Sequence, residues 1–243
     1  MSTGQLHLLF IRHGETQDNI DKILQGQRDT DLTEKGVREA QVLADKLKDQ
    51  RIDALYHSPL KRMVQTVKPI LDDKKDVYVE ADPDLMGQGL GELEGGSYSL
   101  IDFSSPRSAD DTTGAERFDD FVARLKAVMG RIVAAQAPKV GKEDQVVAVA
   151  THGVGITSIF KVLESTTTCV GFNPPLAVRG PEAYEVRWTD SDDVAKMVIA
   201  KPAELPVKDG TLDWEKINGK PFEIVYWGKV DSPRRELLNA KVV

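Results

Sequence analysis

The sequence predicts a three-layer α/β/α domain whose central sheet is mostly parallel and whose site lies at the C-terminal edge of that sheet. Two short apolar runs, residues 6–11 and 145–150, have the uninterrupted pattern of strands that are buried on both faces. Each run is soon followed by a histidine and a glycine, with the histidines at His13 and His152. Because ligands of open α/β sheets bind beyond the carboxyl ends of the strands, both histidines are expected at the edge that carries the site.

Helices and strands alternate along the rest of the chain, as this fold class requires. Thr33 is expected to cap a helix that ends near Asp49, and Pro59 suits the first turn of a second helix. Further strands are expected over 52–56 and 77–79, and further helices over 118–133 and 154–163. The apolar positions expected to face the core are Val37, Ala40, Leu43, Ala44 and Leu47 in the first helix and Leu60, Met63, Val64, Val67, Ile70 and Leu71 in the second.

The segments expected around the site are polar or rich in glycine. Residues 17–31 are predicted to form a polar loop over the end of the first strand. Residues 82–96 contain five glycines and are predicted to form a mobile loop at the level of the site. Residues 103–113 have a composition typical of a lid.

The C-terminal part of the chain predicts a hairpin followed by a tail. The hairpin is expected from strands over 182–189 and 194–201. The tail is too rich in aromatic and aliphatic residues to be disordered. We therefore expect an α/β domain over 1–203 and an extension over 204–243 that packs on the same domain.

Composition excludes several functional classes. The net charge of -7 argues against general nucleic-acid binding. No apolar run is long enough for a membrane span, and the N-terminal residues lack the pattern of a signal peptide. The single cysteine, Cys169, excludes an internal disulfide and a cysteine metal site. These features predict a cytoplasmic protein that binds neither nucleic acid nor membrane.

The residue types at the predicted edge suit a reactive site for an anion. Arg12 carries a planar fork of donors that matches phosphate, and His13 can act as a nucleophile or as an acid and base. Arg62 is expected in the first turn of a helix whose N-terminus points to the same edge. Taken singly, His13 is equally compatible with a structural histidine at a strand end, and Arg62 with a solvated surface arginine.

Together these motifs resemble the histidine phosphatase superfamily, in the branch of the phosphoglycerate mutases and fructose-bisphosphatases. The resemblance covers about residues 5–165 and rests on these segments: Arg12-His13-Gly14-Glu15-Thr16 with Asn19, Leu32-Thr33 with Gly36, Ser58-Pro59-Leu60-Lys61-Arg62 with Gln65-Thr66, Gly91-Glu92-Leu93-Glu94-Gly95, Gly114-Ala115-Glu116 and His152-Gly153. Residues 23–27 are similar to fructose-2,6-bisphosphatase-like phosphatases. Extra segments that would retain a bisphosphate cofactor are hardly evident, which favours a phosphatase over a mutase.

The resemblance implies hydrolysis of a small phosphorylated metabolite, a phosphate monoester, through a phosphohistidine on His13. It implies that Arg12, Arg62 and His152 hold the phosphoryl oxygens, and that no metal or other cofactor takes part. It further implies a hydrogen bond from Asn19 to the phosphoryl group and an orienting role for Glu116. The other residues expected to bind substrate are Gln25, Gly26 and Gly153.

One position departs from the family pattern. Where the family carries the glutamate that serves as general acid, this chain has Gly87. Three alternatives remain open. A nearby carboxylate (Glu92, Asp84 or Glu15) replaces the acid, or the glycine only slows turnover. Otherwise the protein is a diverged or non-catalytic member that binds a phosphorylated ligand, contacts a protein partner through its C-terminal extension, or performs a different reaction in the same site.

Overall fold

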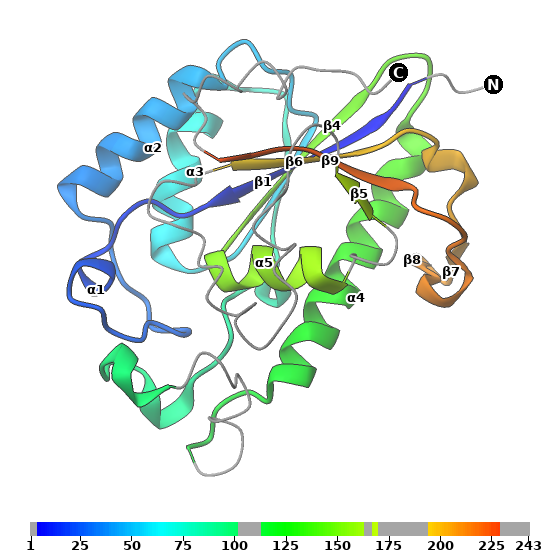
Figure 1. Cartoon of the computed structure of the whole chain (residues 1–243). Coiled ribbons are helices and arrows are strands. Elements are labelled where there is room, and N and C mark those ends of the chain that lie inside the picture. Colours follow the sequence, from blue (N-terminus) through cyan, green and yellow to red (C-terminus); the bar gives the residue numbers. More distant parts are fainter. Residues whose placement is uncertain (1–3, 102–112, 163–166, 170–193, 229–243) are drawn as a thin grey trace.

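A computed structural model of the chain describes residues 4–101, 113–162, 167–169 and 194–228. Within these residues the central sheet has seven strands in the order β3-β2-β4-β1-β6-β9-β5 (Figure 1). Their bounds are β1 Leu6–Arg12, β2 Ala54–His57, β3 Tyr78–Ala81, β4 Gln145–Thr151, β5 Thr167–Cys169, β6 Val194–Ile199 and β9 Phe222–Gly228. A separate short ribbon pairs β7 (Val207–Lys208) with β8 (Thr211–Leu212).

The strands around β1 run mostly parallel, which confirms the predicted sheet. The pairs β1–β4, β2–β4, β2–β3 and β5–β9 are parallel. Strand β6 is antiparallel to both of its neighbours, β1 and β9. Because β1, β2 and β4 are parallel neighbours, their carboxyl ends lie at one common edge of the sheet.

Helices cover both faces of this sheet and complete the predicted three layers. Their bounds are α1 Gln17–Ile20, α2 Glu34–Lys46, α3 Lys61–Asp73, α4 Phe118–Gln136 and α5 Gly153–Val162. Helices α2 and α3 lie on one face, and α4 and α5 on the other (Figure 1). None of the helices in the described part of the chain is both long and apolar enough to cross a membrane.

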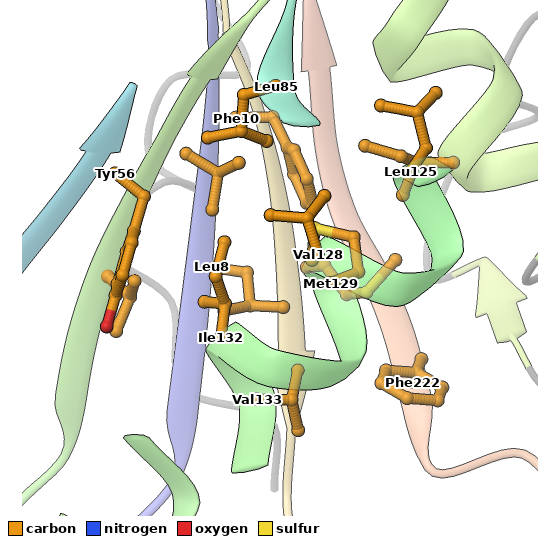
Figure 2. Packing of buried hydrophobic residues seen from close by; sticks show 14 of the residues in the cluster. Leu8, Phe10, Tyr56, Leu85, Leu125, Val128, Met129, Ile132, Val133 and Phe222 are labelled. Carbon is orange, nitrogen blue, oxygen red and sulfur yellow. The ribbon is translucent and has the colours of Figure 1, made fainter. Parts of the chain in front are cut away.

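The core consists of two apolar layers because successive side chains of β1 point to opposite faces. Leu8 and Phe10 pack with Leu125, Val128 and Ile132 of α4 (Figure 2). The intervening residues Leu9 and Ile11 pack with Leu43, Met63 and Val67 of α2 and α3. A strand that is apolar on both faces is thereby fully buried, as its sequence predicts.

Two predicted core positions are wrong, and both errors have the same cause. Val37 is 53% exposed and Val64 is 42% exposed. In α2 the inward position of the first turn is taken by Gly36, and in α3 the neighbouring inward position is taken by Thr66. The prediction placed only apolar side chains in the core. At residue 36 the close approach of the Glu15 backbone requires a glycine, and at residue 66 the hydroxyl of threonine hydrogen-bonds to Gly14 and Arg62.

Several element boundaries also differ from the expectation. Helix α2 stops at Lys46, where Leu47 takes the C-cap position, instead of continuing to Asp49. The second and third strands begin one or two residues later than predicted. The predicted strand over 182–189 lies outside the described residues, as does the lid segment except for its last residue, Thr113.

The segment that follows β6 returns to the same sheet. Strand β9 pairs with β6 and β5. Before it, Trp214 stacks on Phe222 with 6.1 Å between ring centroids, and Leu212 belongs to the core layer of α4. Residues 202–228 therefore share the core of the preceding segments.

Candidate active site

The two histidines that follow the apolar strands meet at the carboxyl edge of the sheet. Arg12 at the end of β1 is the register partner of Thr151 at the end of β4, so the next residues, His13 and His152, emerge side by side. Their ring centroids are 5.3 Å apart. Both side chains are buried, with 8% of His13 and 5% of His152 exposed.

His13 has the tautomer and the charge state of a nucleophile. Its Nδ1 lies 2.8 Å from the carbonyl oxygen of Gly14. Since a carbonyl only accepts, Nδ1 carries the ring proton and Nε2 keeps a free lone pair. Burial lowers the pKa of His13 well below its usual value, and the charges of Arg62 and Arg12 lower it further. The ring is therefore neutral at neutral pH.

In His152 the other ring nitrogen is engaged: Nε2 has the hydrogen-bond partner, not Nδ1. Its Nε2 lies 2.9 Å from Oγ of Ser58, whereas its Nδ1 is buried and has no hydrogen-bond partner among the described residues. Burial, followed by the charge of Arg62, lowers the pKa of His152 well below its usual value. When the hydroxyl of Ser58 donates to Nε2, the ring proton sits on Nδ1 and can be donated to a bound oxyanion.

Arg62 supplies a buried positive charge next to both rings. It is the second residue of α3, and 2% of it is exposed. Its Nη2 donates to the carbonyl of Gly26 at 2.9 Å and its Nη1 to that of Arg28 at 2.7 Å. Its Nε is buried without a partner in the described structure. Burial lowers the pKa of Arg62 to about 10, so the side chain stays charged.

Backbone contacts fix the position of the His13 loop. A Cβ atom at Gly14 would lie 2.6 Å from the carbonyl oxygen of Gly36, and a Cβ atom at Gly36 would collide with the carbonyl oxygen of Glu15. Both positions therefore require glycine. The N–H of Gly14 donates to Oγ1 of Thr66 at 3.0 Å. Helix α3 thus fixes Gly14 through Thr66, and the carbonyl of Gly14 in turn orients the His13 ring.

Arg124 and Glu116 form a clamp, an ion pair that binds the backbone of residues 84–89. Arg124 of α4 donates to the carbonyls of Asp84, Met86 and Gly87 at 2.7, 3.2 and 3.2 Å. The edge of its guanidinium formed by Nε and Nη2 donates two hydrogen bonds to the carboxylate of Glu116, at 2.8 and 2.7 Å. Because the charge of Arg124 also contributes to the lowered pKa of His152, this clamp belongs to the electrostatics of the site.

The arrangement can bind a phosphoryl group and attack it. Arg12 and Arg62 provide positive charge, His152 has a buried Nδ1 without a partner among the described residues, and His13 presents a neutral Nε2. No group of three or more histidine, cysteine, aspartate or glutamate side chains in the described part of the chain is placed to hold a metal ion. Charge development on the phosphoryl oxygens would be stabilised by fixed side chains.

Comparison with known proteins identifies the family. A model of the histidine phosphatase superfamily (branch 1) matches residues 8–171. The chain belongs to the histidine phosphatase superfamily. Phosphoglycerate mutase-like protein 4 of Arabidopsis thaliana is 32% identical over 165 residues, which are 63% of this chain and 69% of that protein. A broad-specificity phosphatase of Saccharomyces cerevisiae is 32% identical over 168 residues, 65% of this chain and 70% of the relative.

The fold agrees with the family as well. The solved structure of a phosphoglycerate mutase from Bacillus anthracis superposes with a TM-score of 0.65 and 25% identity, over 83% of this chain and 91% of that structure. The phosphoglycerate mutase-like fold predicted from the sequence is thereby confirmed. This histidine phosphatase superfamily member is an enzyme of the phosphatase type.

Of the predicted substrate-binding residues of the 17–31 segment, the structure links Gly26 to Arg62 and connects Asn19 and Gln25 through Thr16. Oδ1 of Asn19 accepts from the N–H and the hydroxyl of Thr16, which caps α1, so its amide nitrogen is the end able to donate to a ligand. Oε1 of Gln25 accepts from the hydroxyl of Thr30 and lies 3.1 Å from Oγ1 of Thr16, whose single proton goes to Asn19. Gly26 has a φ of 50° and gives its carbonyl to Arg62.

The remaining predicted residues are placed as follows. Gly153 is the first residue of α5, directly after His152. Glu116 lies in the ion pair with Arg124 and also accepts the N–H of Gly89 at 3.0 Å. These contacts suit the orienting role that the resemblance implies for Glu116, and they occupy both of its carboxylate oxygens.

The three carboxylates considered as replacement acids are engaged or exposed. Glu15 pairs with Lys35 at 2.6 Å, and this hydrogen bond lowers the pKa of Glu15. Asp84 pairs with Arg131 at 2.8 Å. Glu92 is exposed on a short 3-10 turn, where its backbone N–H donates to Thr113.

Sequence reasoning missed three residues that organise the site: Ser58, Thr66 and Arg124. Ser58 and Thr66 lie in segments that carry the family resemblance, but a hydroxyl that bonds to a distant backbone group leaves no signal in a single sequence. Glu116 lies in the loop before α4 and Arg124 lies in the second turn of that helix. Helical spacing therefore does not link the two residues, and the pair leaves no signal in the sequence.

Proposed function

We propose that this enzyme hydrolyses a small phosphate monoester through a phosphohistidine intermediate on His13. Arg12 and Arg62 bind the phosphoryl oxygens, and Nε2 of His13 attacks the phosphorus atom in line with the leaving oxygen. Nδ1 of His152 donates to a phosphoryl oxygen as negative charge builds up. Water then attacks the phosphohistidine, the N–P bond breaks, and inorganic phosphate leaves.

One observation carries this proposal. His13 is a buried, neutral imidazole whose Nδ1–H is held by the carbonyl of Gly14 at 2.8 Å, next to two arginines. The contact with Gly14 leaves Nε2 as the only reactive nitrogen, and the arginines attract a phosphoryl group to it. The relatives named as phosphatases support the same reaction class.

The experiment compares two histidine variants of the full chain. His13→Ala is expected to abolish turnover of 4-nitrophenyl phosphate while inorganic phosphate still binds to the arginines. His7→Asn is the matched control, because His7 lies at the start of β1, at the other end of the strand, beside Asp144. Retention of the parent rate by His13→Ala would refute the proposal.

Binding without turnover is the second candidate, and Gly87 is the observation that favours it. In that case the phosphate site recognises a phosphorylated ligand, and the C-terminal extension is the segment that contacts a protein partner. Calorimetric binding of a phosphorylated ligand with a stoichiometry near one, combined with no His13-dependent turnover of any phosphate, would establish this alternative.

A further inference from the structure

We infer that the site serves phosphoryl donors whose leaving group departs as a stable anion, such as the carboxylate of an acyl phosphate. This inference rests on the proposed function and specifies its substrate class. It follows from what faces the histidines at residue 87 and from how the neighbouring carboxylates are engaged.

Residue 87 forms part of the wall of the site. A Cβ atom at Gly87 would lie 3.6 Å from Cγ and 3.8 Å from Cδ2 of His152. A side chain at this position would therefore point at the reacting centre. The position is fixed, because the Gly87 carbonyl accepts hydrogen bonds from Arg124 at 3.2 Å and from Gln27 at 3.1 Å. The chain places a glycine there, and glycine has no proton to give.

Four carboxylates on the surrounding loops are engaged within the fold, whereas Glu92 is exposed. Both oxygens of Glu116 accept from Arg124, one from Nε and one from Nη2. Oε1 of Glu94 accepts the backbone N–H groups of Gln27 and Leu90 at 2.8 and 3.0 Å. Glu15 and Asp84 are paired with cations. The oxygens of these four carboxylates are thus engaged in hydrogen bonds or ion pairs within the fold, and the hydrogen bond from Lys35 lowers the pKa of Glu15.

The electrostatics at the two rings point the same way. The charged side chains that act on His13 are Arg62 and Arg12, and those that act on His152 also include Arg124. Within the described residues no carboxylate contributes to either pKa. The field at the reacting centre is thus cationic, which favours a departing anion and disfavours a neutral proton donor.

The chemistry of the first step then selects the substrate. Nε2 of His13 forms a bond to phosphorus, the bond from phosphorus to the bridging oxygen breaks, and the leaving group takes the electron pair. An acyl phosphate releases a carboxylate, whose conjugate acid has a pKa of about 4, so no proton is required. An alcohol is about as weak an acid as water, and its phosphate ester needs a proton donor at this step.

The test is a leaving-group series with three versions of the enzyme. The probes are acetyl phosphate, 4-nitrophenyl phosphate, phenyl phosphate and glycerol 3-phosphate, assayed with the parent, Gly87→Glu and Gly87→Gln. Gly87→Gln is the matched control, because glutamine has nearly the shape of glutamate but cannot donate a carboxyl proton. Either side chain requires the Gly26 carbonyl, 3.2 Å from the new Cβ, to move by a few tenths of an ångström.

We expect the parent to hydrolyse acetyl and 4-nitrophenyl phosphate in a His13-dependent manner. Phenyl and glycerol phosphate should be slower by a factor of about 10² or more, the size that general acid catalysis has. Gly87→Glu should raise the rates of the slow pair by about 10²–10⁴, while Gly87→Gln leaves them low.

Two results would overturn the inference in distinguishable ways. Equal His13-dependent kcat/KM values of the parent on all four probes would show that a proton donor reaches the leaving group, and the proposed function would stand. No His13-dependent turnover of any probe would overturn the proposed function together with the substrate class. The parent series decides the matter even if a Gly87 variant fails to fold.

Discussion

Replacing Thr66 by valine tests how the fold holds the reactive histidine. Thr66 is 1% exposed, and its hydroxyl lies 2.6 Å from the carbonyl of Arg62 and 3.0 Å from the N–H of Gly14. Valine keeps the shape of the side chain and removes the hydroxyl. The N–H of Gly14 then loses its acceptor, although the carbonyl of the same residue still has to orient His13.

The magnitude follows from these two hydrogen bonds. A donor left without a partner in a protein interior costs about 1–3 kcal/mol. The Arg62 carbonyl adds little, because in a helix it also accepts the backbone N–H four residues later. We therefore expect Thr66→Val to lower the free energy of unfolding by about 1–3 kcal/mol. A shift of the nucleophile by about 1 Å costs up to about 10² in rate, so kcat should fall by about 10- to 100-fold.

The assay combines urea unfolding with kcat for 4-nitrophenyl phosphate. Thr66→Ser is the control, because serine keeps the hydroxyl and loses only a buried methyl group, worth about 0.8 kcal/mol. Serine should therefore lower stability slightly and retain kcat. If Thr66→Val kept the same kcat as Thr66→Ser, the proposed route from α3 through Gly14 to His13 would be refuted.

Three further predictions concern the charges and tautomers of the site. Ser58→Ala should lower the free energy of unfolding by about 1–3 kcal/mol and mix the two tautomers of His152, and unchanged nitrogen NMR shifts of that ring would contradict this. Arg62→Lys cannot span two carbonyls and a phosphate, so phosphate affinity measured by calorimetry should fall about 10- to 100-fold; an unchanged affinity would contradict the role of the fork. The pH dependence follows from the lowered pKa values of His13 and His152. Both rings stay neutral in the folded state but bind protons below pH 6.5 when unfolded, so stability is full above pH 6.5 and falls as pH decreases below it. Urea midpoints at about pH 7.5 and about pH 5.5 check this sign, and a midpoint that rises on acidification would contradict it.

The sequence predicts the sheet and the meeting of the two histidines because both depend on local patterns. An uninterrupted apolar run predicts a strand buried on both faces, and β1 and β4 have such runs. Two such strands in parallel place the residues after them at one edge. The local runs place His13 and His152 at that edge, and the direct pairing of β1 with β4 brings the two rings together.

The second layer of the site could not be predicted in the same way. Thr66 and Ser58 act through hydrogen bonds to groups 52 and 94 positions away in the chain. Such partners are chosen by the tertiary fold and leave no periodicity in the sequence. Hydrophobic spacing even assigned Val64 to the core, while the polar Thr66 occupies the inward position beside it.

The position of Gly87 shows what the structure adds to a motif. The sequence alone indicates that the family's glutamate is missing. The structure adds that residue 87 faces His152 and that the candidates Glu15 and Asp84 are held in ion pairs. A comparison of phosphate esters with good and poor leaving groups can therefore test whether another carboxylate replaces the missing acid.

The most direct measurement of the central claim is the capture of the phosphorylated enzyme. The parent is mixed with acetyl phosphate and quenched in base, in which phosphohistidine survives, and the modified residue is mapped by mass spectrometry. We predict one phosphoryl group on His13 and none in His13→Ala. Turnover without any phosphohistidine, or a phosphoryl group on His152 instead, would contradict the role assigned to His13.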